Sequence, residues 1–444
     1  MKTLIIGQIM VDVSIPKTMI EPKLRFGGIM HAARALWSID STFGIAYFAP
    51  DYLDEQIGTY AKSFNSFLTR KIGSIKGAPN ILLIREPKET GSQGYESLLR
   101  YESSSLTYEK ELIEVLNSEK WDNILVFPGG FDLNLCWKHI CNCEAKLYID
   151  VNFEPQDWSF FKAFDKKIET IILSTSSDYF LKEMKGETSK LLESSKNTSC
   201  NSLLFKENRG GSRFFYGESL SRQIQIPAQL SSISHSVGVG DCYNAIFASM
   251  RHQMSDQEAL SFASCVSAEY ASTTCPDEFQ RNVSSWRKIP IKDIIQLKGV
   301  SIAWEKRPDF QIYIAGPDFN FVNTKPIDRI VESLKYHNFT PRLPVRENGQ
   351  MGEKASHSLK KSLCCKDIEL LTKCSMLIAV MLYHDPGTLI EIGIAIEKGI
   401  PVVVYEPFEH SDNLMLTELP KLVTSDIDEV IMSVFTEASN AIKS

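Results

Sequence analysis

The chain has 444 residues, more than one ordinary domain needs, which predicts two or three domains. Its hydrophobic content of 43% and charged content of 23% are typical of folded globular proteins, and no apolar run is long enough to predict a membrane span. The formal net charge is −7, with 13 Lys and Arg against 19 Asp and Glu from residue 309 onward and 35 against 36 before it. Neither part is basic, so we exclude nucleic acid as a partner and expect a small molecule.

The first residues, MKTLIIGQIMVDVSI, combine an early Lys with an apolar run, as a signal peptide does. They also contain Gln8 and Asp12 and lack a small-residue cleavage site, so we expect a first β-strand over 3–14 instead. The ten cysteines are scattered and form no CxxC pair. This argues against a metal site and favours reduced thiols in a cytoplasmic protein.

Short apolar runs ending in polar or Gly residues alternate with helical patterns up to about residue 274. The expected strands are NILLIRE, NILVFPGG, KLYIDVNF, TIILS and SLLFKE. The expected helices are GGIMHAARALWSI after its glycines, VGVGDCYNAIFASMRHQ and DQEALSFASCVSAEYAST. This alternation predicts an α/β fold with a largely parallel sheet.

The segment HSVGVGDCYNAIFA, residues 235–248, carries the chemistry of this first part. Gly238, Val239 and Gly240 open a helix, so their free N–H groups form an anion site. Asp241 follows at once, and a carboxylate there suits a base that takes a proton from an alcohol attacking a phosphate. Gly-x-Gly-Asp alone is a common pattern, so its context matters.

Residues 1 to about 295 resemble the ribokinase-like (PfkB) carbohydrate and nucleoside kinases, at GQIMVDVSI, FGGIMHAARAL, DVNFEPQDW and VGVGDCYNA in that order. The resemblance implies a ribokinase-like α/β domain over 1–300. It implies Asp241 as the base, residues 238–240 as the anion hole, and ATP with Mg²⁺ as the phosphoryl donor. The implied substrate and nucleotide contacts are Asp12, Gly27, Gly28 and His31 for the substrate and Gly210 for the nucleotide.

Several positions depart from that family pattern. They are His31 for an Asn, Glu154 for an Arg, His235 for an Asp, Glu207 for a Gly, and Thr175–Asp178 for Asn-x-x-Glu. A Glu in place of Arg or Gly beside a polyphosphate should weaken ATP binding. Two hypotheses remain: an active kinase, or a fold that binds a sugar or nucleoside without phosphorylating it.

A mixed polar segment follows residue 274, and the α/β rhythm restarts after a boundary that we place near 300–309. Strands are predicted at FQIYIAGPDF, MLIAVML and IPVVVYE, and helices at PIDRIVESLKYHN, KDIELLTKCS and GTLIEIGIAIEKG. We expect a second, smaller α/β domain over 309–444.

The stretch HDPGTLIEIGIAIEKG places Asp385 and Glu391 at the start of an apolar helix. Its isoleucines cover nearly the whole circumference, which predicts a buried helix beginning near Thr388. An idle carboxylate inside it would cost several kcal/mol, less near the helix N-terminus, so Glu391 is either a capping-type residue or a working group. Ligands bind beyond the carboxyl ends of strands, where Asp367, Asp385, Glu391 and Tyr313 could converge. Paired carboxylates of this kind cleave glycosidic bonds.

Residues 311–405 resemble the nucleoside 2-deoxyribosyltransferase family at IYIAGPDF, KDIELLTKCSMLIAV and DPGTLIEIGIAIEKGIPVVV. The resemblance implies a Rossmann-like or flavodoxin-like parallel-sheet domain that needs no cofactor and forms a homo-oligomer. It implies Glu391 as the nucleophile, held by Tyr313. Asp385 and Asp367 would contact and protonate the base. The remaining implied ligand contacts are Gly316 and Thr388.

Relatives that hydrolyse nucleoside monophosphates tend to carry Ser where Asp385 stands, so the Asp favours an unphosphorylated nucleoside. The aromatic that often precedes the Asp367 segment is replaced by Cys364–Cys365, and an Asp usual after that helix is Ser375. The base and the sugar therefore stay open. Two other hypotheses are an N-glycoside hydrolase acting as a defence or toxin-like effector, and a degenerate kinase-like regulator.

Overall fold

The structure is a computed structural model of the chain, which describes residues 1–15, 23–76, 81–92, 94, 96–98, 104–151, 159–162, 166–196, 198–350, 356–408 and 413–443. The chain divides into two compact units. The first comprises residues 1–88 and 93–301, and the second comprises residues 302–444 with the short segment 89–92. Across the described ranges, no helix combines the length and the apolar character that crossing a bilayer requires.

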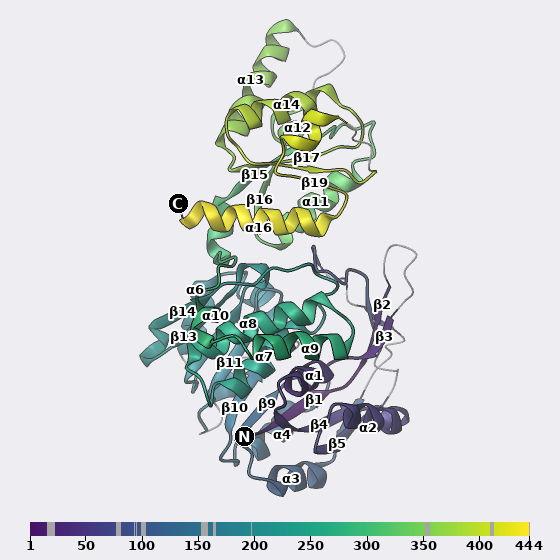
Figure 1. The fold of residues 1–444 in the computed structure, drawn as a ribbon, viewed down its shortest axis with the longest axis vertical. Coiled ribbons are helices and arrows are strands. Elements are labelled where there is room, and N and C mark those ends of the chain that lie inside the picture. The colour runs from purple at the N-terminus through teal and green to yellow at the C-terminus, as the bar shows by residue number, and fades with distance from the viewer. Residues whose placement is uncertain are drawn as a thin grey trace. The chain divides into compact units, whose positions relative to one another are not determined.

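The centre of the first unit is a ten-stranded sheet, whose strands in spatial order are β14 (Arg222–Ile226), β13 (Ser212–Tyr216), β12 (Ser202–Lys206), β11 (Thr170–Ser174), β10 (Lys146–Asp150), β9 (Asn123–Val126), β1 (Lys2–Gln8), β4 (Thr42–Ala49), β5 (Leu68–Lys76) and β8 (Ser104–Thr107) (Figure 1). Neighbours from β12 to β5 are parallel, and β8, β13 and β14 pair antiparallel at the edges. β9, β11 and β12 are buried at every position, as expected of apolar strands covered on both faces. The predicted α/β fold with a largely parallel sheet is confirmed.

Three helices of the first unit contribute many side chains to an apolar core: α1 (Met30–Ser38), α7 (Val239–Met250) and α8 (Asp256–Ser272). Their buried side chains pack with those of the sheet, and α8 begins at a reciprocal capping box between Ser255 and Glu258. The other helices are α2 (Asp54–Ser63), α3 (Glu109–Ser118), α4 (Leu133–Ile140), α5 (Ser159–Lys162), α6 (Thr188–Lys196), α9 (Pro276–Trp286) and α10 (Ile291–Ile295).

A second sheet of the first unit has four strands, in the order β3 (Lys23–Phe26), β2 (Val11–Ser14), β6 (Ile81–Ile84) and β7 (Glu96–Leu98). The single strand expected over 3–14 is therefore wrong, because β1 and β2 belong to different sheets. The chain leaves the large sheet between them, where the carbonyls of Gln8 and Met10 accept hydrogen bonds from Ile29 and Gly27. This crossing carries Asp12 into the small sheet.

The second unit has one all-parallel sheet, in the spatial order β16 (Thr340–Arg342), β15 (Gln311–Ala315), β17 (Met376–Val380), β18 (Val402–Tyr405) and β19 (Leu422–Thr424). Counted within the unit, the order is 2-1-3-4-5, which is the flavodoxin-like order. The predicted Rossmann-like or flavodoxin-like parallel sheet is confirmed. In this topology the strand order reverses between β15 and β17, and ligands bind in the crevice above the carboxyl ends there.

The helices of the second unit are α11 (Lys325–Tyr336), α12 (Pro344–Asn348), α13 (His357–Lys373), α14 (Pro386–Glu397), α15 (Leu414–Glu418) and α16 (Ile427–Lys443), preceded by a short 3₁₀ segment, Trp304–Asp309. Two expectations for α14 are wrong. It begins at Pro386, capped by Asp385, rather than near Thr388. It is also not buried all round, because only one face packs against the sheet and Ile390 is 62% exposed.

Replacing Ile378 by Ala tests the core of the second unit. Ile378 is fully buried in β17 and lies in register with Ile314 and Val403. The substitution should destabilise this unit by about 2–5 kcal/mol, because it removes buried methyl groups and leaves a cavity. The shift is measured by urea unfolding followed by circular dichroism. Ile442→Ala, at a side chain that is 56% exposed, should leave the midpoint nearly unchanged, and equal midpoints for both variants would contradict the packing described.

Candidate functional site

Tyr313 and Glu391 meet where the strand order of the second unit reverses. Tyr313 lies in β15 and its hydroxyl donates a hydrogen bond of 2.6 Å to Oε1 of Glu391, in the second turn of α14. Tyr313 is fully buried among the apolar side chains between the sheet and α14. The rigid strand therefore holds the carboxylate of Glu391 at the carboxyl edge of the sheet.

Two further carboxylates lie close to Glu391. Asp385 is the N-cap of α14, where its Oδ2 accepts hydrogen bonds from the amide (2.8 Å) and the hydroxyl (2.9 Å) of Thr388. Asp367, on α13, accepts a hydrogen bond of 2.8 Å from the amide of Asn348 on α12. The structure thus brings together the four residues that the sequence pointed to, and Thr388 is buried and donates to the capping residue Asp385.

The pKa of Glu391 is raised to about 7, mainly by burial and to a smaller extent by the nearby charges of Asp367 and Asp385. The hydrogen bond from Tyr313 acts in the opposite direction, because it stabilises the ionised form. The carboxyl group therefore changes its charge near neutral pH. A nucleophile or base with such a pKa is available in its ionised form at neutral pH and above.

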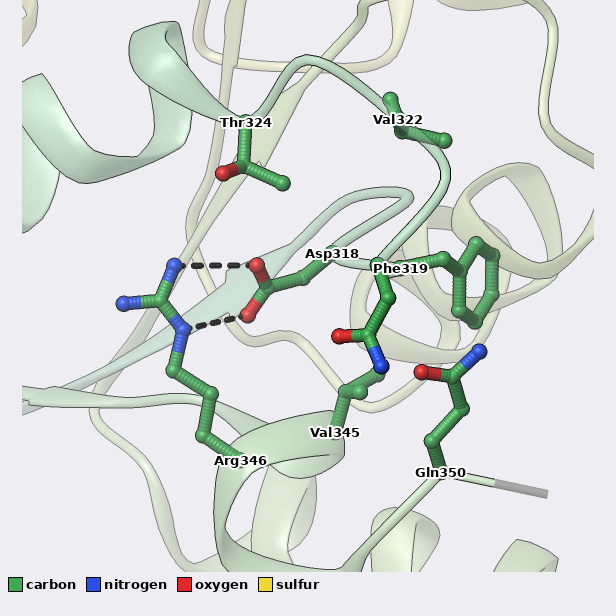
Figure 2. Close-up of a pocket in the computed structure, with 8 residues that line it drawn as sticks. Asp318, Phe319, Val322, Thr324, Val345, Arg346 and Gln350 are labelled. Carbon is green, nitrogen blue, oxygen red and sulfur yellow. Dashed lines mark hydrogen bonds and ion pairs between the residues drawn. The ribbon is translucent and has the colours of Figure 1, made fainter.

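A cavity of about 380 Å³ lies beside the loop that follows β15. Figure 2 shows Arg346 facing the carboxylate of Asp318, which it binds through Nε (2.6 Å) and Nη2 (2.9 Å), while Nη2 also contacts Asp328 at 2.6 Å. The residues that line the cavity are Asp318, Phe319, Asn320, Val322, Thr324, Val345, Arg346 and Gln350. Because α12 supplies both Arg346 and Asn348, the partner of Asp367, one helix joins the cavity to the carboxylates.

Sequence reasoning missed Arg346, Asn348 and Gln350. The signal that could have revealed them is the polar stretch VRENGQ, which comes after the carboxyl end of β16. Gly316 was expected to allow close approach of a ligand. A Cβ there would lie 3.2 Å from Ile327 and from the carbonyl of Val380, so other parts of the protein approach this glycine closely. Packing within the protein therefore explains why a small residue is needed at this position.

In the first unit, the structure brings Asp12, His31 and the loop at Gly238 together. His31 Nε2 lies 3.0 Å from Asp12 Oδ2, and its Nδ1 lies 2.7 Å from the hydroxyl of Tyr270. A Cβ at Gly27 would overlap with the Asp12 carboxylate, and one at Gly238 would overlap with the His31 ring. Gly28 has a φ of +59° and packs on the carbonyl of Gln8, so these glycines allow close packing around Asp12 and His31.

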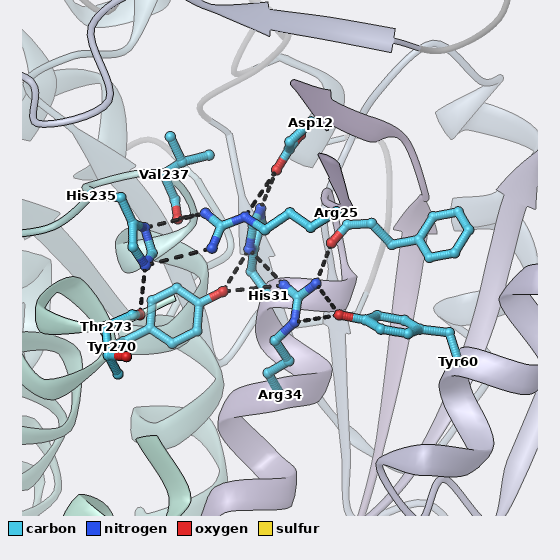
Figure 3. A network of polar contacts seen from close by, with 10 residues as sticks. Asp12, Arg25, His31, Arg34, Tyr60, His235, Val237, Tyr270 and Thr273 are labelled. Carbon is cyan, nitrogen blue, oxygen red and sulfur yellow. Dashed lines mark hydrogen bonds and ion pairs between the residues drawn. The ribbon is translucent and has the colours of Figure 1, made fainter. Parts of the chain in front are cut away.

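Sequence reasoning missed two arginines of this site (Figure 3). Arg25, on β3, contacts His235 and donates to the carbonyl of Val237 at 3.1 Å. Arg34, one turn after His31 on α1, donates to the hydroxyls of Tyr60 (2.7 Å) and Tyr270 (3.2 Å). Polar side chains one turn apart in the apolar helix MHAARALWS are the signal that could have revealed Arg34.

Both histidines of this cluster are held neutral at pH 7. Burial lowers the pKa of His31 to about 4, although its hydrogen bond to Asp12 opposes the shift. Burial and the neighbouring Arg25 lower the pKa of His235 to about 3. The imidazoles can therefore exchange hydrogen bonds without adding positive charge.

Asp241 lies in the first turn of α7, after Gly238, which adopts the left-handed conformation at the N-cap with a φ of +77°. The pKa of Asp241 is raised to about 7, first by burial and then by the negative charge of Asp150, while the positive charge of Lys206 opposes the shift. Lys206 binds Asp150 at 3.0 Å and lies 3.5 Å from the carbonyl of Gly240. Asp241 is therefore a buried carboxyl group at the N-terminus of α7, and its role as a base stays a prediction.

Asp150 and Asp178, two carboxylates that could help to hold Mg²⁺, are both paired with lysines in this structure. The ammonium group of Lys206 lies against Asp150, and Asp178 is 62% exposed and binds Lys182 at 2.7 Å. In the part of the chain that the structure describes, no three or more His, Cys, Asp or Glu side chains are grouped to hold a metal ion. We therefore derive no step through an ATP-bound magnesium ion.

Glu207, one of the positions expected to weaken ATP binding, has its charge paired within the protein. Glu207 is fully buried and forms two hydrogen bonds of 2.8 Å with Arg213, which balances its charge. Gly210 is buried at the end of a 3₁₀ turn, Asn208–Gly210. Glu154 and the segment around it lie outside the described residues.

Replacing Glu391 by Gln should stabilise the protein above pH 7. The folded pKa of about 7 exceeds the ordinary value of 4.5, so Glu391 lowers stability as pH rises from the unfolded to the folded pKa. Gln removes this cost, which is at most about 3 kcal/mol, and still accepts from Tyr313. Thermal unfolding should show a raised midpoint at pH 8 and little change at pH 5. A gain of the same size at both pH values would contradict the raised pKa.

Residues 312–422 match the family model described as nucleoside 2-deoxyribosyltransferase. No curated protein matches the chain. Among solved structures, the chain is similar to phosphofructokinase-2 from Escherichia coli in complex with fructose-6-phosphate, at 15% identity and a TM-score of 0.48, over 65% of this chain and 99% of that one.

Two further structures are similar over the same share of the chain. Ribokinase from Thermotoga maritima is 13% identical with a TM-score of 0.46, over 65% of this chain and 99% of that one. A Burkholderia thailandensis nucleoside kinase in complex with inosine is 11% identical with a TM-score of 0.49, over 64% and 95%. These likenesses are too distant to assign an activity to the first unit. The second unit contains, at residues 312–422, a nucleoside 2-deoxyribosyltransferase family domain.

Proposed function

We propose that the second unit cleaves the N-glycosidic bond of a nucleoside and transfers the sugar to another base, with Glu391 as the nucleophile. The hydrogen bond of 2.6 Å from Tyr313 to Glu391 carries this proposal, because it holds a carboxylate at the strand-order reversal, the expected ligand site. The match of residues 312–422 to the nucleoside 2-deoxyribosyltransferase family supports it.

In the first step, the ionised carboxylate of Glu391 attacks C1 of the sugar. The bond from C1 to the base nitrogen breaks, its electron pair stays on the base, and a proton from solvent reaches the base through Asp385 or Asp367. In the second step, a nitrogen of the acceptor base attacks C1, the bond from C1 to Glu391 breaks, and the proton of that nitrogen returns to the carboxylate. Water in place of the acceptor base would give hydrolysis.

The surrounding contacts suit these roles. Tyr313 favours the ionised form of Glu391, the form that attacks, and keeps it aimed in one direction. Thr388 binds Oδ2 of Asp385, so Oδ1 is the oxygen left to face a base. In the same way Asn348 binds Oδ1 of Asp367 and leaves Oδ2. Each proposed proton donor is thus oriented through one oxygen.

The cavity beside α12 is the proposed place for the base. Its volume of about 380 Å³ falls in the usual range of small-molecule sites, roughly 300–1,000 Å³. The negative charge of Asp385 disfavours a 5′-phosphate, so we propose an unphosphorylated nucleoside as the substrate. The first unit would bind a sugar or nucleoside, and kinase activity there remains a prediction.

Chromatography of nucleosides and deoxynucleosides incubated with the pure protein tests the proposal. A new nucleoside should form only when a free base is added, and Glu391→Ala should reduce the rate at least about 10³-fold, as loss of a nucleophile does. Glu397→Ala is the matched control, because Glu397 lies on the same helix with its side chain 79% exposed. Free base without an acceptor would establish the hydrolase instead, and unchanged turnover in Glu391→Ala would refute the site.

Tyr313→Phe should change the pH profile as well as the rate. The wild-type kcat should rise with pH to a plateau above about 7, because Glu391 acts when ionised. The variant loses a hydrogen bond to a charged group, which should lower kcat by about 10- to 150-fold. Its rising limb should also move to higher pH, because Tyr313 no longer favours the carboxylate. A uniform loss at every pH would indicate a merely structural role for Tyr313.

A further inference from the structure

The polar cluster of the first unit contains two guanidinium groups and little negative charge to balance them (Figure 3). Arg25 and Arg34 both reach the space around His31, where Asp12 is the carboxylate in contact. The exposed fraction is 2% for Asp12 and His31, 3% for His235 and 4% for Arg34. These groups are thus almost completely withdrawn from water.

Among the residues that the structure describes, all the hydrogen-bond partners of Arg34 are neutral groups. Its donors reach the hydroxyls of Tyr60 and Tyr270, the imidazole of His31 and the carbonyl of Phe26. A buried guanidinium without a carboxylate is costly, because neutral acceptors replace only part of its hydration. An anion placed near Arg34 would offset this cost.

Arg25 is the more accessible of the two arginines, with its side chain 17% exposed. Its Nη2 donates to the carbonyl of Val237, and its ion-pair distance to Asp12, from Nε to Oδ2, is 3.9 Å, too long for a hydrogen bond. Asp12 instead lies at hydrogen-bond distance, 3.0 Å, from His31. The contacts of Arg25 are therefore ones that an anionic ligand could replace with stronger ones.

The charges in this region sum to a positive surplus. Arg25 and Arg34 are two permanent cations near His31, and the two histidines are neutral, as described above. Asp241 is close enough for Asp12 to influence it, but burial keeps it only partly ionised at pH 7. Lys206 and Asp150 form a separate pair that cancels.

We propose that Arg25 and Arg34 form a binding site for the phosphate monoester of a small molecule. The phosphate would take the place of Val237 and His235 on Arg25, and would supply the negative charge that Arg34 lacks. Guanidinium groups bind phosphate through paired hydrogen bonds, which a neutral hydroxyl cannot match. The first unit would thus select a phosphorylated sugar over the neutral sugar. This site is independent of the function proposed for the second unit.

Isothermal titration of the full-length protein with ribose 5-phosphate, ribose and inorganic phosphate tests the site. Ribose 5-phosphate should bind at least about tenfold more tightly than ribose, and its affinity should fall as salt is added. Inorganic phosphate binding as tightly would show that the phosphate supplies the recognition. Weaker binding of inorganic phosphate would show that the sugar contributes as well.

Arg25→Gln should weaken binding of ribose 5-phosphate at least about tenfold and leave the affinity for ribose unchanged. Arg34→Lys keeps the charge but loses the fork of donors, and should weaken it to a smaller extent. Arg70→Gln is the control, at an exposed arginine of the same unit that pairs with Glu114. Circular dichroism shows whether each variant is folded.

Equal affinities for ribose and ribose 5-phosphate would overturn the proposal. The same holds if a folded Arg25→Gln variant binds ribose 5-phosphate as the wild type does. Absence of binding to all three probes would overturn it as well. None of these outcomes depends on Glu391, so they are distinguishable from failure of the transferase.

Discussion

The hydrogen bond from Tyr313 to Glu391 is the interaction on which the chemistry of the second unit depends. It joins the first strand of the parallel sheet to the helix after the neighbouring strand, where the strand order reverses. Because Tyr313 is fully buried, Glu391 is held by a group that cannot move into solvent. The same bond opposes the burial and the two carboxylates that raise the pKa of Glu391. One contact therefore influences both the direction and the ionisation of the proposed nucleophile.

The two units concentrate charge of opposite sign. Asp367, Asp385 and Glu391 gather negative charge in the second, which suits the positive charge that a sugar develops while its glycosidic bond breaks. Arg25 and Arg34 gather positive charge around His31 in the first, where Asp12 is the contacting carboxylate, and this suits an anion. In each unit the charges are held in place by neutral partners, such as Tyr313 and Thr388 in the second and Tyr60 and Tyr270 in the first. Their arrangement therefore precedes any ligand.

Reasoning from the sequence succeeded where a local pattern decides the structure. The apolar runs became strands, most of them buried, and the Gly-rich turns became the starts of α1 and α7. It failed where a distant segment decides. The apolar run over 3–14 divides between two sheets because Gly27 and Ile29 bind its carbonyls. The isoleucines of α14 suggested complete burial, but only one face meets the sheet and Ile390 remains exposed. The sequence shows which residues of a helix are apolar, but the fold determines which of them are covered by neighbours.

The sequence by itself determined the α/β class of both parts, the positions of most strands and helices, and the carboxylates and Gly-rich loop with which chemistry could be done. Only the tertiary structure decided which groups meet. Tyr313 and Glu391 are 78 residues apart, and Arg25 reaches His235 across 210 residues. Glu207, expected to weaken ATP binding, has its charge balanced by Arg213 of β13. The charge, pKa and direction of a side chain depend on its neighbours in space, and spacing along the chain does not specify those neighbours.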